Sequence, residues 1–425
     1  MISFDLKQFK AVILPVFVTA SVLIAGHTSF ALDVTCVSKD VISIPSKIHP
    51  NQPDSPTFQY RIRHIVRKHS PEAPTVIFIP GGPGQTSIAA GDTWGIPERF
   101  NVILTDPRSI GCNSDSASII PKDAISTHNV AHDILTAVRT LGLKNYVVYG
   151  ISYGTVVATV LQDLAQQDGL SARAVVLEGT AGYASENWQM VGYNAVLKRL
   201  LDQLPTGVRD KIIGMEEGNP GLLQRTPEQW ARFFMSEYAS TGVIPGMGSF
   251  LKTLLVDGLG ERATETGRQN LILSIDAANT QRTSIEAQFY KSVACRELWP
   301  SVEGPKTLKR GRIRKVNNST NFCEGISFDR QYNPKDFRLK TRVYYIHGTD
   351  DPNTPVGLAR VHFKLQSSAD RLFVLVNGAG HNPSASAPKC MSHLWDQISH
   401  GTADVAALQR NCEWPVQGII ARPEN

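Results

Sequence analysis

The sequence lacks the features that mark several large classes of protein. Charged residues are only 19% of the 425 residues and the net charge is +5, a balance too mild to indicate nucleic-acid binding without an aromatic and basic motif. There is no internal repeat and no low-complexity tract, and no two cysteines have the C-x-x-C spacing of a metal or redox site. The 42% of hydrophobic residues is ordinary for a globular chain. We therefore expect a folded protein without a nucleic-acid partner.

The sequence also has no apolar run of the ~20 residues that a membrane span needs. Its apolar run, Ala11–Ala25, follows a short basic region that ends at Lys10, and small residues at positions 29 and 31 form a cleavage site. This layout predicts a secretory signal peptide over residues 1–31 and export to the periplasm or the medium. The alternative is an uncleaved membrane anchor, because no charge lies between Lys10 and Asp33.

The six cysteines all follow the predicted signal peptide, and an even number in an exported chain suggests disulfides. Six cysteines allow 15 pairings. Our preferred pairing joins neighbours along the chain, and the alternative is that some remain buried thiols. It pairs Cys36 with Cys112, Cys295 with Cys323, and Cys390 with Cys412.

Short apolar runs alternate with helical patterns in two parts of the chain. Strand, helix, strand order predicts parallel strands joined by crossover helices. A block of mostly helical periodicity separates the two parts, and within it the basic segment 306–315 is expected to be a solvated loop. The expected strands are 75–79, 101–105, 145–149, 174–177, 342–346 and 371–376, the expected helices 129–141, 155–166 and 390–399, and the expected units 32–180 (core), 181–336 (helical cap) and 337–425 (core).

Gly150-Ile151-Ser152-Tyr153-Gly154 is a complete G-x-S-x-G motif between a predicted strand and a predicted helix. In this context the motif forms a sharp turn that exposes the serine hydroxyl above the sheet, as in the α/β-hydrolase fold. Ser152 is therefore the candidate nucleophile. The N–H of Tyr153 is a candidate oxyanion donor, and the second donor is expected from the glycine loop after strand 75–79, at Gly81 or, preferably, Gly82.

In this fold the acid and the base follow the serine in that order. Asp350 and Asp351 come directly after strand 342–346, at the edge where ligands bind in parallel sheets. His381 stands on a glycine-containing loop after the next strand and is the candidate base. His347 is the alternative base, but its place at the strand end favours a packing role.

The same motifs occur in the same order in the proline iminopeptidase and tripeptidyl aminopeptidase family, which this chain resembles over about residues 60–415. They are the Gly-Gly-Pro-Gly loop, Asp106-Pro107-Arg108-Ser109-Ile110-Gly111, the Gly-Ile-Ser-Tyr-Gly elbow, Asp351 with Pro355, and Gly380-His381. The resemblance implies an α/β-hydrolase fold with an inserted helical cap. It also implies that the acid is Asp351 and not Asp350.

The chain departs from that family at two places: Pro80 stands where His usually precedes the glycine loop, and Ser109 replaces a glycine. The family's cap carries acidic residues that bind the free amine of the substrate. Glu178, Glu216, Glu217 and Glu286 are only candidates for this role, since for each one an ordinary surface carboxylate is the simpler interpretation.

These residues predict an exported serine hydrolase that acts through an acyl-enzyme on Ser152, with neither a metal nor an organic cofactor. The resemblance implies an aminopeptidase that releases N-terminal residues or short peptides. Hydrolysis of an ester or another small acyl compound is the alternative, and a non-catalytic binding protein is the alternative of another class. We expect a small-molecule or peptide substrate, and no stable membrane partner after signal cleavage.

Overall fold

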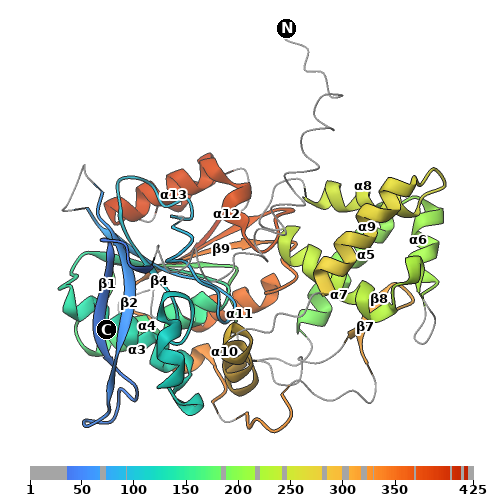
Figure 1. Cartoon of the computed structure of the whole chain (residues 1–425). Helices are drawn as coiled ribbons and strands as arrows, with labels where there is room; N and C mark the ends of the chain where they lie inside the picture. Colours follow the sequence, from blue (N-terminus) through green and yellow to red (C-terminus); the bar gives the residue numbers. More distant parts are fainter. Residues whose placement is uncertain are drawn as a thin grey trace.

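The computed structural model places a helix-flanked β-sheet beside a smaller helical body (Figure 1). The predicted signal peptide lies outside the residues that the structure describes. Across the described residues, no helix is long and apolar enough to span a membrane. The described residues are 36–67, 73–91, 93–182, 188–215, 221–241, 247–279, 285–298, 306–316, 323–328, 330–367, 370–402, 404–412 and 416–419.

The sheet has nine strands in the order β1-β2-β4-β3-β5-β6-β9-β10-β11. The six central strands, β4, β3, β5, β6, β9 and β10, run parallel to one another. They confirm all six expected strands. The outer strands β1, β2 and β11 pair antiparallel with their neighbours, and β1 and β11 form the two edges. The bounds are β1 Val41–Lys47, β2 Thr57–Ile65, β3 Thr75–Ile79, β4 Asn101–Thr105, β5 Tyr146–Ile151, β6 Ala174–Glu178, β9 Arg342–Gly348, β10 Arg371–Val376 and β11 Val416–Ile419.

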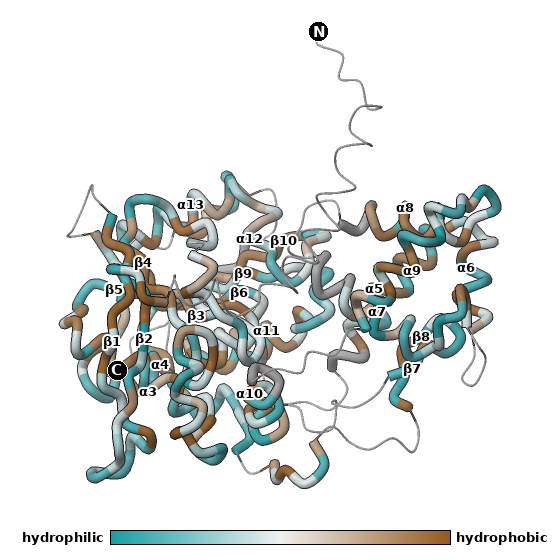
Figure 2. The backbone as a smooth tube through the Cα atoms, in the orientation of Figure 1, coloured by the Kyte–Doolittle hydropathy of each residue, from teal (hydrophilic) through white to brown (hydrophobic). Residues whose placement is uncertain are grey.

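The central strands read as continuous apolar runs because both faces of the sheet are covered. Figure 2 shows the hydrophobic residues concentrated along these strands. Side chains alternate between two cores, so that Ile77 packs on one face and Phe78 on the other. The face that contains Ile77 is covered by α3 Thr127–Thr140, α4 Tyr153–Gln167, α10 Ile285–Val293 with the π-helical turn Ala294–Leu298, and α11 Val356–Leu365. The face that contains Phe78 is covered by α13 Pro388–His400 and α14 Val405–Asn411.

The helical body between β6 and β9 has its own hydrophobic core, centred on buried aromatic side chains such as Trp230 and Phe233. This separate core is the physical reason that it stands apart from the sheet in Figure 1. It contains α5 Trp188–Gln203, α6 Thr206–Ile213, α7 Pro227–Thr241, α8 Met247–Leu259, α9 Glu265–Asn279 and the strands β7 Lys306–Lys309 and β8 Arg312–Lys315.

The expectation of a solvated loop over residues 306–315 is wrong. The segment is a two-stranded antiparallel hairpin, and its apolar residues Leu308 and Ile313 are buried in the core of the helical body. Arg310 and Gly311 form its two-residue turn, and both have positive φ, 51° and 66°. Such a turn matches the twist of a hairpin. Each strand places one apolar residue inward, and the many basic residues around it hid both strands in the sequence.

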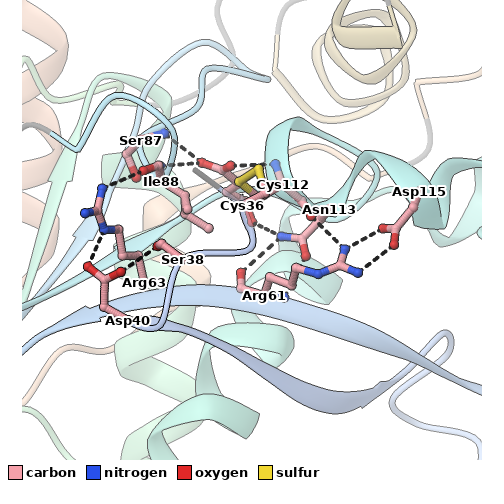
Figure 3. Close-up of a disulfide and its surroundings, with 11 residues drawn as sticks. Cys36, Ser38, Asp40, Arg61, Arg63, Ser87, Ile88, Cys112, Asn113 and Asp115 are labelled. Carbon is pink, nitrogen blue, oxygen red and sulfur yellow. Dashed lines mark hydrogen bonds and ion pairs between the residues drawn. A yellow bond between two sulfur atoms is a disulfide. The ribbon is translucent and has the colours of Figure 1, made fainter. Parts of the chain in front are cut away.

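The structure contains three disulfides, Cys36–Cys112, Cys295–Cys323 and Cys390–Cys412, which confirms the predicted pairing of neighbours. The first joins the start of the described chain to the segment after β4 (Figure 3). Two ion pairs reinforce this junction: Arg61 on β2 binds Asp115, and Arg63 binds Asp40, each at 2.7 Å.

Candidate active site

Ser152 occupies the turn between β5 and α4 with φ 56° and ψ −122°, a conformation that non-glycine residues rarely adopt. The turn is held because the Ser152 N–H donates to the carbonyl oxygen of Glu178 at 2.9 Å. Both flanking glycines are required by close backbone contacts. A Cβ at Gly150 would lie 2.2 Å from the Gly154 oxygen, and one at Gly154 would lie 2.2 Å from the Ile79 oxygen. The motif therefore folds into a nucleophile elbow.

The glycine loop after β3 lies directly against this serine. A Cβ at Gly81 would lie 3.0 Å from the Cβ of Ser152. Gly82 has φ 107°, which a residue with a side chain would rarely adopt, and precedes a cis peptide bond to Pro83. Tyr153 opens α4, and the N–H groups of a first helical turn have no partner within the helix. The two segments from which oxyanion donors were expected are therefore adjacent.

His381 and Asp351 form a buried pair. The Nδ1 atom of His381 lies 3.0 Å from Oδ1 and 2.9 Å from Oδ2 of Asp351. The carboxylate also accepts hydrogen bonds from the N–H of Asn353 (2.9 Å) and from the N–H and Oγ1 of Thr354 (2.9 and 2.6 Å). Thr354 was not singled out in the sequence, although a hydroxyl three residues after a carboxylate in a strand-end loop is a local signal for such a bond.

The two partners change each other's pKa. Burial by itself would raise the pKa of Asp351, but the charge and hydrogen bond of His381 outweigh it and hold the pKa below its ordinary value. Burial likewise opposes the charged form of His381, yet the carboxylate of Asp351 raises the pKa of the imidazole above its ordinary value. The pair therefore favours an imidazolium next to a carboxylate.

His347, the alternative base, and Asp350, the acid next to Asp351, have partners of their own. His347 is fully buried, and its Nδ1 accepts the N–H of Thr180 at 3.2 Å, so the Nε2 atom carries the proton and donates to the Thr354 carbonyl at 2.6 Å. Burial lowers the pKa of His347, which keeps it neutral. Asp350 forms an ion pair with Arg199 of α5 at 3.2 Å. Of the two neighbouring acids, Asp351 is the one that contacts His381.

The end of β6 connects the serine to the histidine. Ser152 binds the backbone of Glu178, and the next residue, Gly179, packs against the His381 ring, so that a Cβ there would lie 3.1 Å from both Nδ1 and Cε1. Residues that are more than 200 positions apart in the sequence thus meet at one edge of the sheet. This is the carboxyl edge of the parallel strands, where sites form in such sheets.

The four acidic candidates for binding a substrate amine differ in their positions, and the buried one, Glu178, has hydrogen-bond partners within the protein. Glu178 is fully buried, and its carboxylate accepts hydrogen bonds from the N–H and Oγ of Ser384, at 3.0 and 2.7 Å, and from the hydroxyl of Tyr149. A surface carboxylate is therefore the wrong interpretation for Glu178. Glu216 and Glu217 lie outside the described residues, and Glu286 falls on α10. Within the described part of the chain, no group of His, Cys, Asp and Glu is arranged to hold a metal ion.

The sheet order, the crossover helices and the elbow define the α/β-hydrolase fold, as predicted. A family model described as the alpha/beta hydrolase fold matches residues 74–208. Similar solved structures include a proline iminopeptidase from Mycobacterium smegmatis (14% identity, 86% of this chain and 99% of that chain, TM-score 0.44). Another is the esterase RhEst1 from Rhodococcus sp. ECU1013 (13% identity, 85% and 98% covered, TM-score 0.43). No curated protein matches the sequence.

Proposed function

We propose that this protein is an exported serine hydrolase, and specifically an aminopeptidase that releases N-terminal residues or short peptides. The observation that carries the proposal is the strained Ser152 elbow at the same sheet edge as the hydrogen-bonded pair of His381 and Asp351. A nucleophile, a base and an acid that orients the base are the three parts that acyl transfer requires.

In the proposed mechanism, His381 takes the proton of the Ser152 hydroxyl as its oxygen attacks the carbonyl carbon of the substrate. Asp351 accepts a hydrogen bond from the Nδ1–H of the imidazole and stays ionised, which leaves Nε2 free to act as the base, and it then stabilises the imidazolium. The N–H groups of Tyr153 and Gly82 stabilise the tetrahedral oxyanion, and each such donor contributes about 3 kcal/mol in comparable sites. His381 then protonates the leaving group, and water releases the acyl group by the reverse sequence.

The choice of an aminopeptidase rests on the order of motifs shared with the proline iminopeptidase and tripeptidyl aminopeptidase family, from the Gly-Gly-Pro-Gly loop to Gly380-His381. Export is supported by the amino-terminal sequence pattern, and the three disulfides are compatible with an oxidising compartment. Hydrolysis of small esters by the same residues is the second candidate. A non-catalytic binding protein is the third.

Labelling with a fluorophosphonate probe tests the proposed chemistry. The wild-type protein should be labelled at Ser152, whereas S152A, folded as judged by its circular dichroism, should not. A folded wild-type protein that resists the probe would favour the binding protein.

Chromogenic aminoacyl, prolyl and tripeptidyl amides, each with a free and with a blocked amine, then separate the two enzymatic candidates. An aminopeptidase should cleave the free amides far faster than the blocked ones. Equal rates on both forms, with faster cleavage of simple esters, would instead indicate an esterase.

A further inference from the structure

Glu178 is a buried carboxylate that the proposed mechanism does not use. It lies at the end of β6 and is fully shielded from solvent. A buried charge is costly unless it is paired or hydrogen-bonded. Here three donors point at the carboxylate: the N–H of Ser384 at 3.0 Å, the Oγ of Ser384 at 2.7 Å, and the hydroxyl of Tyr149. Oε1 accepts both bonds from Ser384 and Oε2 accepts the bond from Tyr149, so both oxygens of the carboxylate are hydrogen-bonded.

These contacts join the nucleophile to the loop that carries the base. The carbonyl oxygen of Glu178 accepts the Ser152 N–H at 2.9 Å, while its side chain holds Ser384, three residues after His381. Between them, Gly179 packs against the His381 ring. A single residue thus fixes two chain segments whose relative position decides whether the imidazole can reach the serine hydroxyl.

Glu178 is also one of the charged and titratable groups around His381. The others that interact with the imidazole are Asp351, in direct contact, and His347, which burial keeps neutral. Burial raises the pKa of Glu178 above its ordinary value, and the hydrogen bonds from Ser384 and Tyr149 and the charge of His381 offset only part of this rise. When ionised, this second carboxylate favours the imidazolium that forms as Ser152 loses its proton.

We infer that Glu178 is a positioning residue, which holds the His381 loop against the nucleophile elbow and supports the imidazolium as a second carboxylate beside Asp351. The inference rests on the proposed hydrolase function for its kinetic consequences. It does not make Glu178 a catalytic residue, because its side chain is bonded to Tyr149 and Ser384 and not to the reacting groups.

Two substitutions separate the two parts of this role. E178Q keeps the shape and the acceptor oxygen but removes the charge, so kcat should fall about tenfold to a hundredfold with little change in KM. The acid limb of the kcat/KM profile should move to lower pH by about half a unit or more, because His381 loses a group that favours its protonated form. E178D keeps the charge but shortens the side chain, so kcat should fall while the acid limb stays in place.

Asp168→Asn is the matched control for loss of one negative charge. Asp168 ends α4, the 15-residue helix that begins next to Ser152, so it lies about 20 Å from the site. Its ion pair with Arg139 is partly exposed. This variant should keep the kcat and the pH profile of the wild type. Melting temperatures of all variants identify any change that reflects unfolding.

An NMR titration of the His381 imidazole completes the test, because it does not depend on turnover. E178Q should lower the pKa of His381, and an unchanged pKa together with wild-type kcat would overturn the inference. If E178Q does not fold, S384A and E178D replace it in the test, and wild-type kcat in both variants would also overturn the inference. Failure of the wild type to react with a fluorophosphonate would refute the proposed function alone, since the imidazole titration would still report on Glu178.

Discussion

Glu297 offers a quantitative prediction about stability. It lies in the π-helical turn Ala294–Leu298, which packs with α10 against the sheet, and it is 4% exposed. Both carboxylate oxygens accept the N–H of Thr127 at the start of α3, at 3.2 and 3.1 Å. The hydroxyl of Thr127 donates to the same carboxylate and lies 3.1 Å from the hydroxyl of Tyr153.

Burial dominates these hydrogen bonds and raises the pKa of Glu297 from 4.5 to about 7. A carboxyl whose pKa is higher in the folded state binds its proton more tightly there than in the unfolded chain. Its stabilising contribution is therefore fully present below pH 4.5 and is lost as the pH rises through about 7. A pKa difference of about 2.5, at about 1.4 kcal/mol for each pH unit, corresponds to about 3 kcal/mol.

The substitution E297Q isolates this contribution, because it keeps the shape of the side chain and removes the titration. The free energy of unfolding should be measured by urea denaturation, with disulfides intact, at steps from about pH 4.5 to pH 8.5. The difference between wild type and E297Q should fall by about 3 kcal/mol over this range and then level off. D202N, which removes an exposed carboxylate from the ion pair with Lys198, controls for net charge. A wild type minus E297Q difference that stays flat across the range would refute the reasoning.

Three further predictions concern the acid, the helical body and the first disulfide. D351N should leave the fold intact but reduce kcat about 10⁴-fold, because the wrong tautomer of His381 is stabilised; near wild-type kcat would exclude Asp351 as the acid. I313A should lower the free energy of unfolding by about 2–5 kcal/mol, since Ile313 is buried in the core of the helical body. The control R312A, on the exposed side of the hairpin, should change the free energy of unfolding little. Equal effects of the two substitutions would contradict the hairpin's burial pattern. Replacing both cysteines of Cys36–Cys112 by alanine should cost about 4.5 kcal/mol, from the 76-residue separation that this disulfide closes. An unchanged urea midpoint would show that the junction is held by its other contacts.

The parallel sheet could be predicted from the sequence because each central strand is buried on both faces and so reads as one apolar run. The outer strands β1 and β2 give no such run: the edge strand β1 alternates buried and exposed residues and contains Pro45. The hairpin of β7 and β8 was missed for the same reason, since single apolar residues between basic ones resemble a loop.

The elbow was predictable because its requirements are local. Gly150 and Gly154 are needed by contacts within a few residues of Ser152 and with the adjacent β3 strand. The disulfide pairing of neighbours was also correct, although spacing alone does not decide among 15 pairings.

Which acid faces the histidine is a property of the tertiary structure. Asp350 and Asp351 have the same chemistry and adjacent positions, but one contacts Arg199 on a helix of the inserted body and the other contacts His381. The direction of the loop backbone after β9 determines this outcome. The side-chain chemistry of two adjacent aspartates does not distinguish them, and in the sequence only the resemblance to the aminopeptidase family implied Asp351.

Glu178 and Glu297 show the same division between sequence and structure. Local sequence marks each of them as a carboxylate with no special surroundings, yet both are buried and hydrogen-bonded to residues 206 and 170 positions away. The sequence by itself determined the six central strands, the elbow and the residue types of the site, because these depend on short-range periodicity and backbone geometry. Only the tertiary structure decided which charges are taken out of water and which donors meet them, because burial and pairing arise from segments that fold together across the whole chain.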